Sequence, residues 1–267
     1  MSSRIAVAAT APFGADVLER LAERHEVVAV LTRPDSRSGR GRTPAPSPAK
    51  VVAERLGIPV HAPERLEAGL ELGASVAVAV AYGLIVPDDV LAERLWLNVH
   101  PSLLPRWRGA APVERALMAG DAETGVSVIR LVHELDAGPI AAQERFPIAA
   151  GDDAGVVYAR AAEVAAQLLD EVLAEDPEPH EQVGEVTYAE KISTVDRQLD
   201  LELPAAELVN RVRALSPHIG ARAKLHDRDV TVWRAVVAAD GSFEPLEVQP
   251  GGGRRMAYDA WLRGLRP

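Results

Sequence analysis

Two polar residues, Asn98 and His100, stand at the end of an apolar run in the stretch L-N-V-H-P-S-L-L-P-R-W-R-G-A-A-P (residues 97–112). Side chains two positions apart on a β-strand point to the same face, so both groups would project together where the strand ends. A third polar group, Asp136, lies in an Asp-x-Gly turn after another strand-like segment. Such a trio suits acyl transfer to an amine, because amide and imidazole N–H groups donate to a developing oxyanion and a carboxylate orients the imidazole. From the residues alone, a structural role for each also stays open.

Motifs of several other catalytic classes are absent from the sequence. The chain has no cysteine, which excludes disulfides, thiolate zinc sites and a cysteine nucleophile. None of its seven histidines has metal-site spacing, since His133-Glu134 lacks a second histidine four residues on. There is no G-x-S-x-G turn and no phosphate-binding P-loop. We therefore expect neither covalent catalysis nor a metal.

The apolar pattern predicts an α/β fold that would place these groups at one sheet edge. Strands are expected at residues 4–10, 26–31, 74–81, 96–99, 125–131 and 140–148, and helices at 15–23, 48–56, 110–119 and 152–173. The first strand–helix–strand unit is typical of a parallel sheet. Ligands in such sheets bind beyond the carboxyl ends of strands, so Tyr82–Ile85, after a buried strand, is a candidate pocket wall.

Local signals punctuate these elements. The first strand is followed by A-A-T-A-P-F instead of G-x-G-x-x-G, which argues against dinucleotide binding. Ser47 before Pro48 indicates a capped helix start, and Asp152 is predicted to cap the long helix. The polar, Pro-bearing segment E-D-P-E-P-H-E-Q-V at 175–183 reads as an interdomain linker. Beyond it we expect alternating short strands and turns, with strands at 229–236 and 243–248.

Charge is distributed unevenly over the 267 residues. The net charge of −10 argues against a general nucleic-acid binder, yet residues 188–267 are near neutral, with 12 Lys and Arg against 11 Asp and Glu. The loop Thr32–Lys50 is the exception, because its five cations face Asp35 alone. A loop this long is either a solvated surface loop or an arm that meets a polyanion. With no signal peptide and no membrane-spanning run visible, a cytoplasmic protein is expected.

These motifs resemble those of the 10-formyltetrahydrofolate-dependent formyltransferases: Asn98-x-His100, then S-L-L-P at Ser102–Pro105, Arg108-Gly109 and Asp136–Gly138. Further segments are similar to the methionyl-tRNA formyltransferase branch, namely R-P-D-x-x-x-G-R-G-R in the loop, P-S-P-x-K at 46–50, L-L-P-R-W-R-G-A-A-P at 103–112 and T-Y-A-E-K-I at 187–192. The resemblance covers most of the chain. It implies a Rossmann-like, mostly parallel catalytic domain and a small OB-like C-terminal β domain, and we expect a monomer.

The resemblance also implies an activity and its residues. A formyl group would pass from the co-substrate 10-formyltetrahydrofolate to the amino group of methionyl-initiator tRNA, for translation initiation. Catalysis falls to Asn98, His100 and Asp136. Folate binding falls to Ser102, Leu103, Leu104, Pro105, Tyr82, Gly83, Leu84 and Ile85. Contacts with tRNA fall to Arg37, Arg40, Arg42 and Lys191.

On this basis the chain divides into a catalytic domain (1–174), a linker (175–187) and a truncated β domain (188–267). Two departures from the family stand out. The first strand ends in A-A-T-A at 8–11, without the usual glycine before the threonine and proline after it. After V-T-V-W-R-A-V-V the chain goes almost directly to L-E-V-Q-P-G-G-G-R-R-M, so we expect an open or reduced barrel with unpaired edges.

Two alternative functions stay open. The first alternative keeps the formyl transfer and changes the acceptor to a nucleotide-linked amino sugar or to glycinamide ribonucleotide. The transformylases that act on glycinamide ribonucleotide also contain H-P-S-L-L-P. Those enzymes carry a Gly-rich phosphate loop after the first strand, which is absent here. The other alternative is a non-catalytic relative that binds folate or tRNA, against which the intact Asn98, His100 and Asp136 argue.

Overall fold

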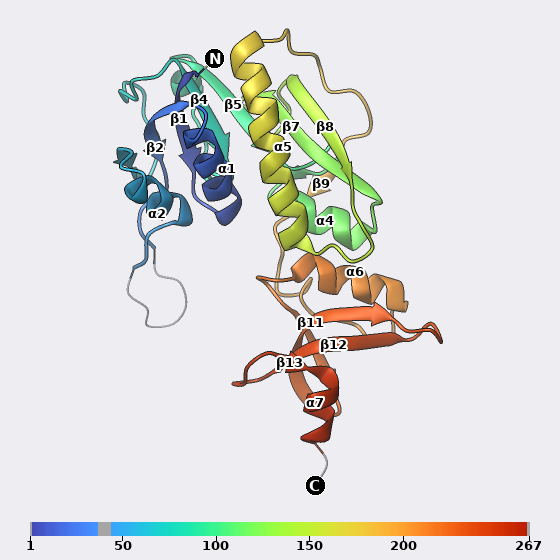
Figure 1. Cartoon of the computed structure of the whole chain (residues 1–267). Coiled ribbons are helices and arrows are strands. Elements are labelled where there is room, and N and C mark those ends of the chain that lie inside the picture. Colours follow the sequence, from blue (N-terminus) through green and yellow to red (C-terminus); the bar gives the residue numbers. More distant parts are fainter. Residues whose placement is uncertain (1, 37–43, 266–267) are drawn as a thin grey trace. The chain divides into compact units, whose positions relative to one another are not determined.

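The computed structural model describes residues 2–36 and 44–265 (Figure 1). Contacts between residues group the chain into two compact units. The first unit comprises Met1–Arg108, Gly125–Arg145 and Ala159–Thr187. The second unit comprises Gly109–Thr124, Phe146–Tyr158 and Tyr188–Pro267. The predicted segment 175–187 thus falls in the first unit, and the domain limits at 174 and 188 stay a prediction.

The first unit is built on a seven-stranded sheet with the order β3-β2-β1-β4-β5-β7-β8. Its strands are β1 Arg4–Ala9, β2 Glu26–Leu31, β3 Val60–His61, β4 Val76–Val80, β5 Leu95–His100, β7 Glu123–Arg130 and β8 Ile140–Pro147. Strands β1 to β5 pair in parallel, whereas β5 and β7 pair antiparallel. The sequence order reverses between β1 and β4, which is the switch point where open sheets of this kind bind ligands.

The central strands are buried on both faces, as their apolar runs predict. Ala6 and Ala8 of β1 face a cluster that includes Leu66, Leu72 and Trp96. The alternate residues of β1 are equally inaccessible to solvent, as are the inner side chains of helix α1 (Pro12–Ala22). Burial on both faces holds β4 and β5 in a fixed register, so the residues at their carboxyl ends occupy defined positions.

The described helices are α1, α2 Pro48–Arg55, α3 Asp88–Leu91, α4 Pro112–Ala119, α5 Ala154–Glu175, α6 Ala205–Leu215 and α7 Tyr258–Arg263. The four predicted helices are present as α1, α2, α4 and α5, each beginning within three residues of its predicted start, whereas α3, α6 and α7 were not predicted. The Ser47 cap of α2 is confirmed, since its hydroxyl accepts from the Lys50 N–H. The predicted Asp152 cap of α5 is wrong by one residue. The Asp153 carboxylate accepts from the Val156 N–H, while Asp152 bonds back to Ala149 N.

The second unit contains an open four-stranded antiparallel sheet, ordered β10-β11-β12-β13. Its strands are β10 Ala221–Leu225, β11 Arg228–Val237, β12 Phe243–Pro250 and β13 Met256–Ala257, and a two-stranded ribbon joins β6 Arg108–Gly109 to β9 Tyr188–Ala189. The expectation of only strands and turns beyond the linker is wrong. Helix α6 packs Leu208, Val212 and Leu215 into the same core as Val232 and Val248, so it covers one face of this sheet.

The predicted fold class is confirmed: a mostly parallel α/β sheet is accompanied by a small, reduced antiparallel sheet. The small sheet is open, with β10 and β13 at its edges. In the part of the chain that the structure describes, no helix is long and apolar enough to cross a membrane.

Candidate active site

Strand β5 delivers Asn98 and His100 to the same face at its carboxyl end. Asn98 lies between Ala79 of β4 and Ile129 of β7, and His100 pairs with Ser127 of β7. His100 is 4% exposed and Asn98 is partly buried. The sheet register therefore fixes both side chains, as the two-residue spacing predicts.

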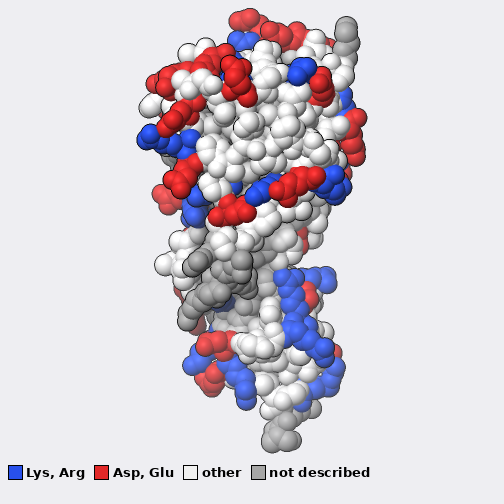
Figure 2. Space-filling view, turned by 90° about the vertical axis from the view of Figure 1, so that its left-hand side faces the viewer, with Lys and Arg blue, Asp and Glu red and all other residues white. Residues whose placement is uncertain are grey.

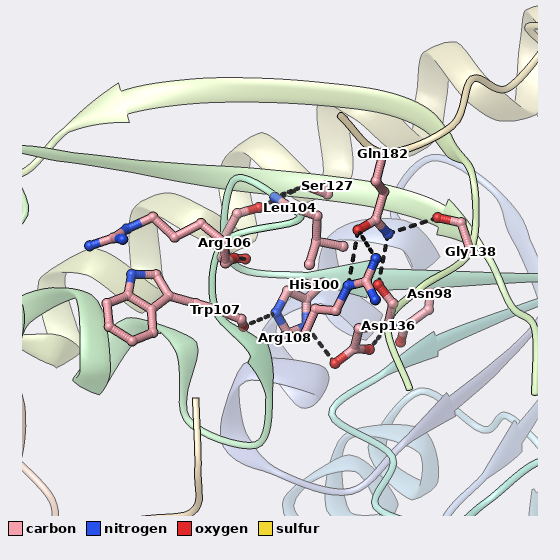
Figure 3. Close-up of polar contacts among 11 residues, drawn as sticks. Asn98, His100, Leu104, Arg106, Trp107, Arg108, Ser127, Asp136, Gly138 and Gln182 are labelled. Atoms are coloured by element: carbon pink, nitrogen blue, oxygen red, sulfur yellow. Dashed lines mark hydrogen bonds and ion pairs between the residues drawn. The ribbon is translucent and has the colours of Figure 1, made fainter. Parts of the chain in front are cut away.

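Asp136 joins them from the turn between β7 and β8 (Figure 3). Its Oδ1 accepts a hydrogen bond from Asn98 Nδ2 at 3.3 Å, and its Oδ2 lies 3.5 Å from His100 Nδ1. Since a carboxylate only accepts, this contact sets the orientation of the Asn98 amide and leaves its second N–H for another acceptor. The predicted trio is thus brought together in one place.

The second ring nitrogen of His100 is also engaged. Nε2 lies 2.8 Å from the carbonyl oxygen of Trp107, and a carbonyl can only accept, so Nε2 carries a proton. Nδ1 faces the Asp136 carboxylate, which would hold an additional proton there. Both ring nitrogens of His100 therefore face oxygen atoms that can accept a hydrogen bond.

Trp107 and Asp136, which both contact His100, have backbone conformations that residues other than glycine rarely adopt. Trp107 has φ 65° and Asp136 has φ 48°, in the left-handed region, where a residue other than glycine costs about 1–3 kcal/mol. Surrounding contacts must impose these conformations. One of them is the close approach of Gly138 to the Arg130 carbonyl, where a Cβ atom would overlap the oxygen.

Replacing Gly138 with alanine should therefore destabilise the first unit. The added methyl would force the turn away from β7, at a cost of about 1–3 kcal/mol in the free energy of unfolding. Urea denaturation would measure the change. Gly151→Ala is the matched control, because nothing lies within 4 Å of its Cβ position. Equal stability of the two variants would contradict the close approach.

A hydrogen-bond network that sequence reasoning missed holds the Asp136 turn from the other side (Figure 3). Gln182 Nε2 donates to the carbonyl oxygens of Asp136 and Gly138 at 2.7 and 2.9 Å. Its Oε1 accepts from Arg108 Nε and Nη2 at 3.1 and 2.7 Å. Arg108 is only 8% exposed, and its Nη1 lies 3.4 Å from Glu134 Oε1. A glutamine in a polar, Pro-bearing segment carries no local signal of such a role.

The predicted folate-binding segment Ser102–Pro105 is a tightly bonded loop. The Ser102 hydroxyl is fully buried and donates to the Arg106 carbonyl at 2.7 Å. Ser127 Oγ donates to the Ser102 carbonyl at 2.7 Å and accepts from Leu104 N at 3.2 Å. Leu104 packs against Ile129 and Ile140, while Leu103 is partly exposed. Ser102 therefore shapes this loop through its backbone contacts.

The other predicted folate-binding residues, Tyr82–Ile85, follow β4. The Tyr82 carbonyl accepts from Thr10 Oγ1 at 2.7 Å, and burial raises the pKa of its phenol to about 12, so the ring stays neutral. Gly83, Leu84 and Ile85 line a groove of about 540 Å³ together with residues 64–67, Pro87 and Asp89. Ile85 is 85% exposed at this groove. The lining of this groove combines the apolar Leu66, Leu84 and Ile85 with charged side chains.

Of the predicted tRNA contacts, Arg37, Arg40 and Arg42 lie outside the described residues. Lys191 is exposed in the second unit. At the described end of the basic loop, Asp35 bonds to the Lys50 ammonium at 2.8 Å and raises the pKa of that lysine. Figure 2 shows Lys and Arg side chains gathered on one face of the second unit. Exposed cations of this unit include Arg222, Lys224, Arg228, Arg234, Arg254, Arg255 and Arg263. Within the described ranges, no cluster of His, Asp and Glu could hold a metal ion.

Comparison with known families places matches on both units. The family described as "Formyl transferase" matches residues 3–173, and "Formyl transferase, C-terminal domain" matches residues 191–244. The methionyl-tRNA formyltransferase of Paracoccus denitrificans is 42% identical over 290 residues, covering 98% of this chain and 97% of the relative. That of Thermus thermophilus is 40% identical over 292 residues, covering 98% and 96%. Both alignments exceed the 267 residues of this chain, so each relative has residues that this chain lacks.

Solved structures share the fold at lower identity. The methionyl-tRNA formyltransferase from Clostridium thermocellum superposes with a TM-score of 0.67 at 16% identity, covering 93% of this chain and 98% of that one. HypX from Aquifex aeolicus in complex with tetrahydrofolic acid superposes with a TM-score of 0.66 at 19% identity, covering 97% of this chain and 46% of that one. These likenesses support the α/β architecture.

Proposed function

Because the chain belongs to the methionyl-tRNA formyltransferase family, we propose that it transfers the formyl group of 10-formyltetrahydrofolate to the amino group of methionine esterified to initiator tRNA. The observation that carries this proposal is the convergence of Asn98, His100 and Asp136 at the carboxyl end of β5. The three groups suit attack by an amine on a formyl carbon, without a covalent enzyme intermediate.

Asn98 stabilises the negative charge that develops on the formyl oxygen. One of its amide N–H groups is committed to Asp136, and the other is available to the formyl oxygen as negative charge develops there. His100 gives the second donation when its Nε2–H exchanges the Trp107 carbonyl for the oxyanion. Such exchange fits the general finding that catalytic hydrogen bonds tighten only once substrate is bound.

His100 and Asp136 together handle the proton that the attacking amine must lose. The attacking amine becomes positively charged when its nitrogen bonds to the formyl carbon, and it then loses a proton through the His100–Asp136 pair. The bond between the formyl carbon and the folate nitrogen breaks, that nitrogen takes up the proton, and tetrahydrofolate leaves. His100 Nδ1 faces a buried carboxylate, so a proton held there forms an ion pair in a site of low exposure. Asp136 thereby keeps the ring oriented and stabilises its charged form.

The folate donor is assigned to two segments that follow the carboxyl ends of β5 and β4. Leu103 to Pro105 offer an apolar wall with fixed backbone groups, and Gly83 to Ile85 line the groove that follows β4. The neutral Tyr82 phenol adds no charge to this wall. We assign the pterin portion of the donor to these residues, in agreement with the resemblance.

The basic loop and the second unit are assigned to tRNA. The loop concentrates Arg37, Arg40 and Arg42 in a chain of net charge −10, so its local field would attract phosphates. Lys191 and the other exposed cations of the second unit offer further contacts to phosphates. Cytoplasmic location and a monomeric state stay predictions.

Replacing Arg37, Arg40 and Arg42 with alanine should raise the KM for methionyl-tRNA about tenfold, while kcat changes less than threefold. Each lost phosphate contact should also lower the slope of log KM against log salt concentration by about 0.7–0.9. Steady-state formylation across a salt series would measure both. Arg4→Ala is the control, because Arg4 lies at the amino end of β1, opposite the active-site edge. An unchanged salt slope would remove tRNA binding from this loop.

The acceptor itself is tested with the same enzyme preparation and folate donor. Initiator methionyl-tRNA is expected to be formylated in preference to elongator methionyl-tRNA, to an amino-sugar nucleotide and to glycinamide ribonucleotide. Transfer to a sugar nucleotide, without transfer to charged tRNA, would favour the alternative acceptor. Folate binding without any transfer would favour a non-catalytic relative.

A further inference from the structure

The side-chain amide of Gln182 connects the turn that carries Asp136 to the side chain of Arg108. This amide donates to two carbonyl oxygens of the Asp136 turn and accepts from two nitrogens of the buried Arg108. Asp136 itself has a left-handed backbone conformation and depends on such contacts to keep it. The direction of its carboxylate follows from that backbone, so Gln182 acts on the carboxylate through the backbone of the Asp136 turn (Figure 3).

The same chain segment also holds the second partner of His100. Trp107 N donates to Thr187 Oγ1 at 2.9 Å, and Arg108 N donates to the Thr187 carbonyl at 2.9 Å. The carbonyl of Trp107 accepts from His100 Nε2. Residues 182 and 187 therefore fix the backbone of both groups that pair with the imidazole.

We propose that Gln182 is a positioning residue for formyl transfer, which holds the Asp136 carboxylate opposite His100 and Asn98 through the Asp136 and Gly138 carbonyls. This inference rests on the proposed function. Only an amide meets the requirement here, because two carbonyls need donors while the Arg108 guanidinium needs an acceptor. A misplacement of about 1 Å at a catalytic group can cost about 10²-fold in rate, so the loss of these bonds should be visible in kcat.

Two variants separate positioning from packing. Gln182→Glu keeps the size of the side chain and its pairing with Arg108, but removes both donors to the turn. Gln182→Leu removes every hydrogen bond. The control is Gln198→Leu, the same substitution at an exposed glutamine of the second unit. Formylation of initiator methionyl-tRNA should show kcat lowered about 10- to 100-fold in both Gln182 variants, with KM for donor and acceptor within threefold of wild type.

A second readout needs no substrate. The ¹⁵N resonances of the His100 imidazole, recorded in the free protein, should change in Gln182→Glu, because the Asp136 carboxylate that faces this ring has moved. They should stay unchanged in Gln198→Leu. Thermal unfolding of Gln182→Glu should remain within a few degrees of wild type, since the charged pair with Arg108 is retained.

Three results would overturn the inference: a wild-type kcat in Gln182→Glu, a loss that arises wholly from KM, or a lowered kcat with unchanged His100 resonances. The last would show that the loss of rate arises away from the His100–Asp136 pair. An inactive wild-type protein would instead count against the proposed function, and the His100 resonances would still decide the role of Gln182.

Discussion

Replacing either His100 or Asp136 with alanine is expected to reduce the formylation rate by about 10³-fold or more. The reason is that the proposed mechanism routes both proton transfer and charge stabilisation through this pair, whose Nδ1 and Oδ2 atoms lie 3.5 Å apart and whose residues are almost fully buried. Single-turnover formylation of methionyl-tRNA measures the chemical step directly. Circular dichroism and thermal unfolding should show that each variant remains folded.

The double variant sharpens this prediction. If His100 and Asp136 act as one unit, then removing both should cost little more than removing His100 alone, because the first loss already disables the second group. Additive losses would instead indicate independent roles. Near-wild-type turnover in either single variant would remove the pair from the mechanism.

Replacing Asn98 with alanine should lower kcat by about 10²- to 10³-fold, the usual cost of one oxyanion donor. The KM for folate should change little, since the contact strengthens only as charge develops on the formyl oxygen. Asn98→Asp should lose as much, because a carboxylate beside Asp136 would repel both that group and the oxyanion. Initial-rate measurements on both variants would give kcat and KM separately.

Asn210→Ala provides the comparison for Asn98. Asn210 belongs to α6 in the second unit, where its Oδ1 accepts from Arg213, so the same substitution there should leave kcat within threefold. If Asn98→Ala also lost less than threefold, the oxyanion would have to be held by other groups.

The sequence predicts the main sheet and the trio because both depend on short-range patterns. A spacing of two residues along a strand is enough to put Asn98 and His100 on one face, and continuous apolar runs identify the central strands. Helix α6 could have been predicted in the same way, since Leu208, Val212 and Leu215 recur at helical spacing. The strand-like segments on the C-terminal side of α6, at 229–236 and 243–248, make the region resemble β structure throughout and obscure this helical period.

Gln182 and Arg108 illustrate what such patterns do not contain. Gln182 meets the Asp136 turn across 46 positions in the chain, and only the completed fold brings them together. Arg108 is an arginine with little exposure, whereas arginine is expected at the surface unless it is paired. Its pairing with Gln182 could be identified only after the path of residues 175–187 was known.

The path of the chain between the two units limits how the protein can be dissected. Residues 109–124 and 146–158 belong to the second unit, although each is flanked by stretches of the first. A fragment ending at residue 174 would discard Gln182 and Thr187, and with them the hydrogen bonds to the backbone of Asp136 and Trp107. Any attempt to study the formyl-transfer half by itself must therefore extend the fragment through Thr187, and no single cut in the chain separates the two units.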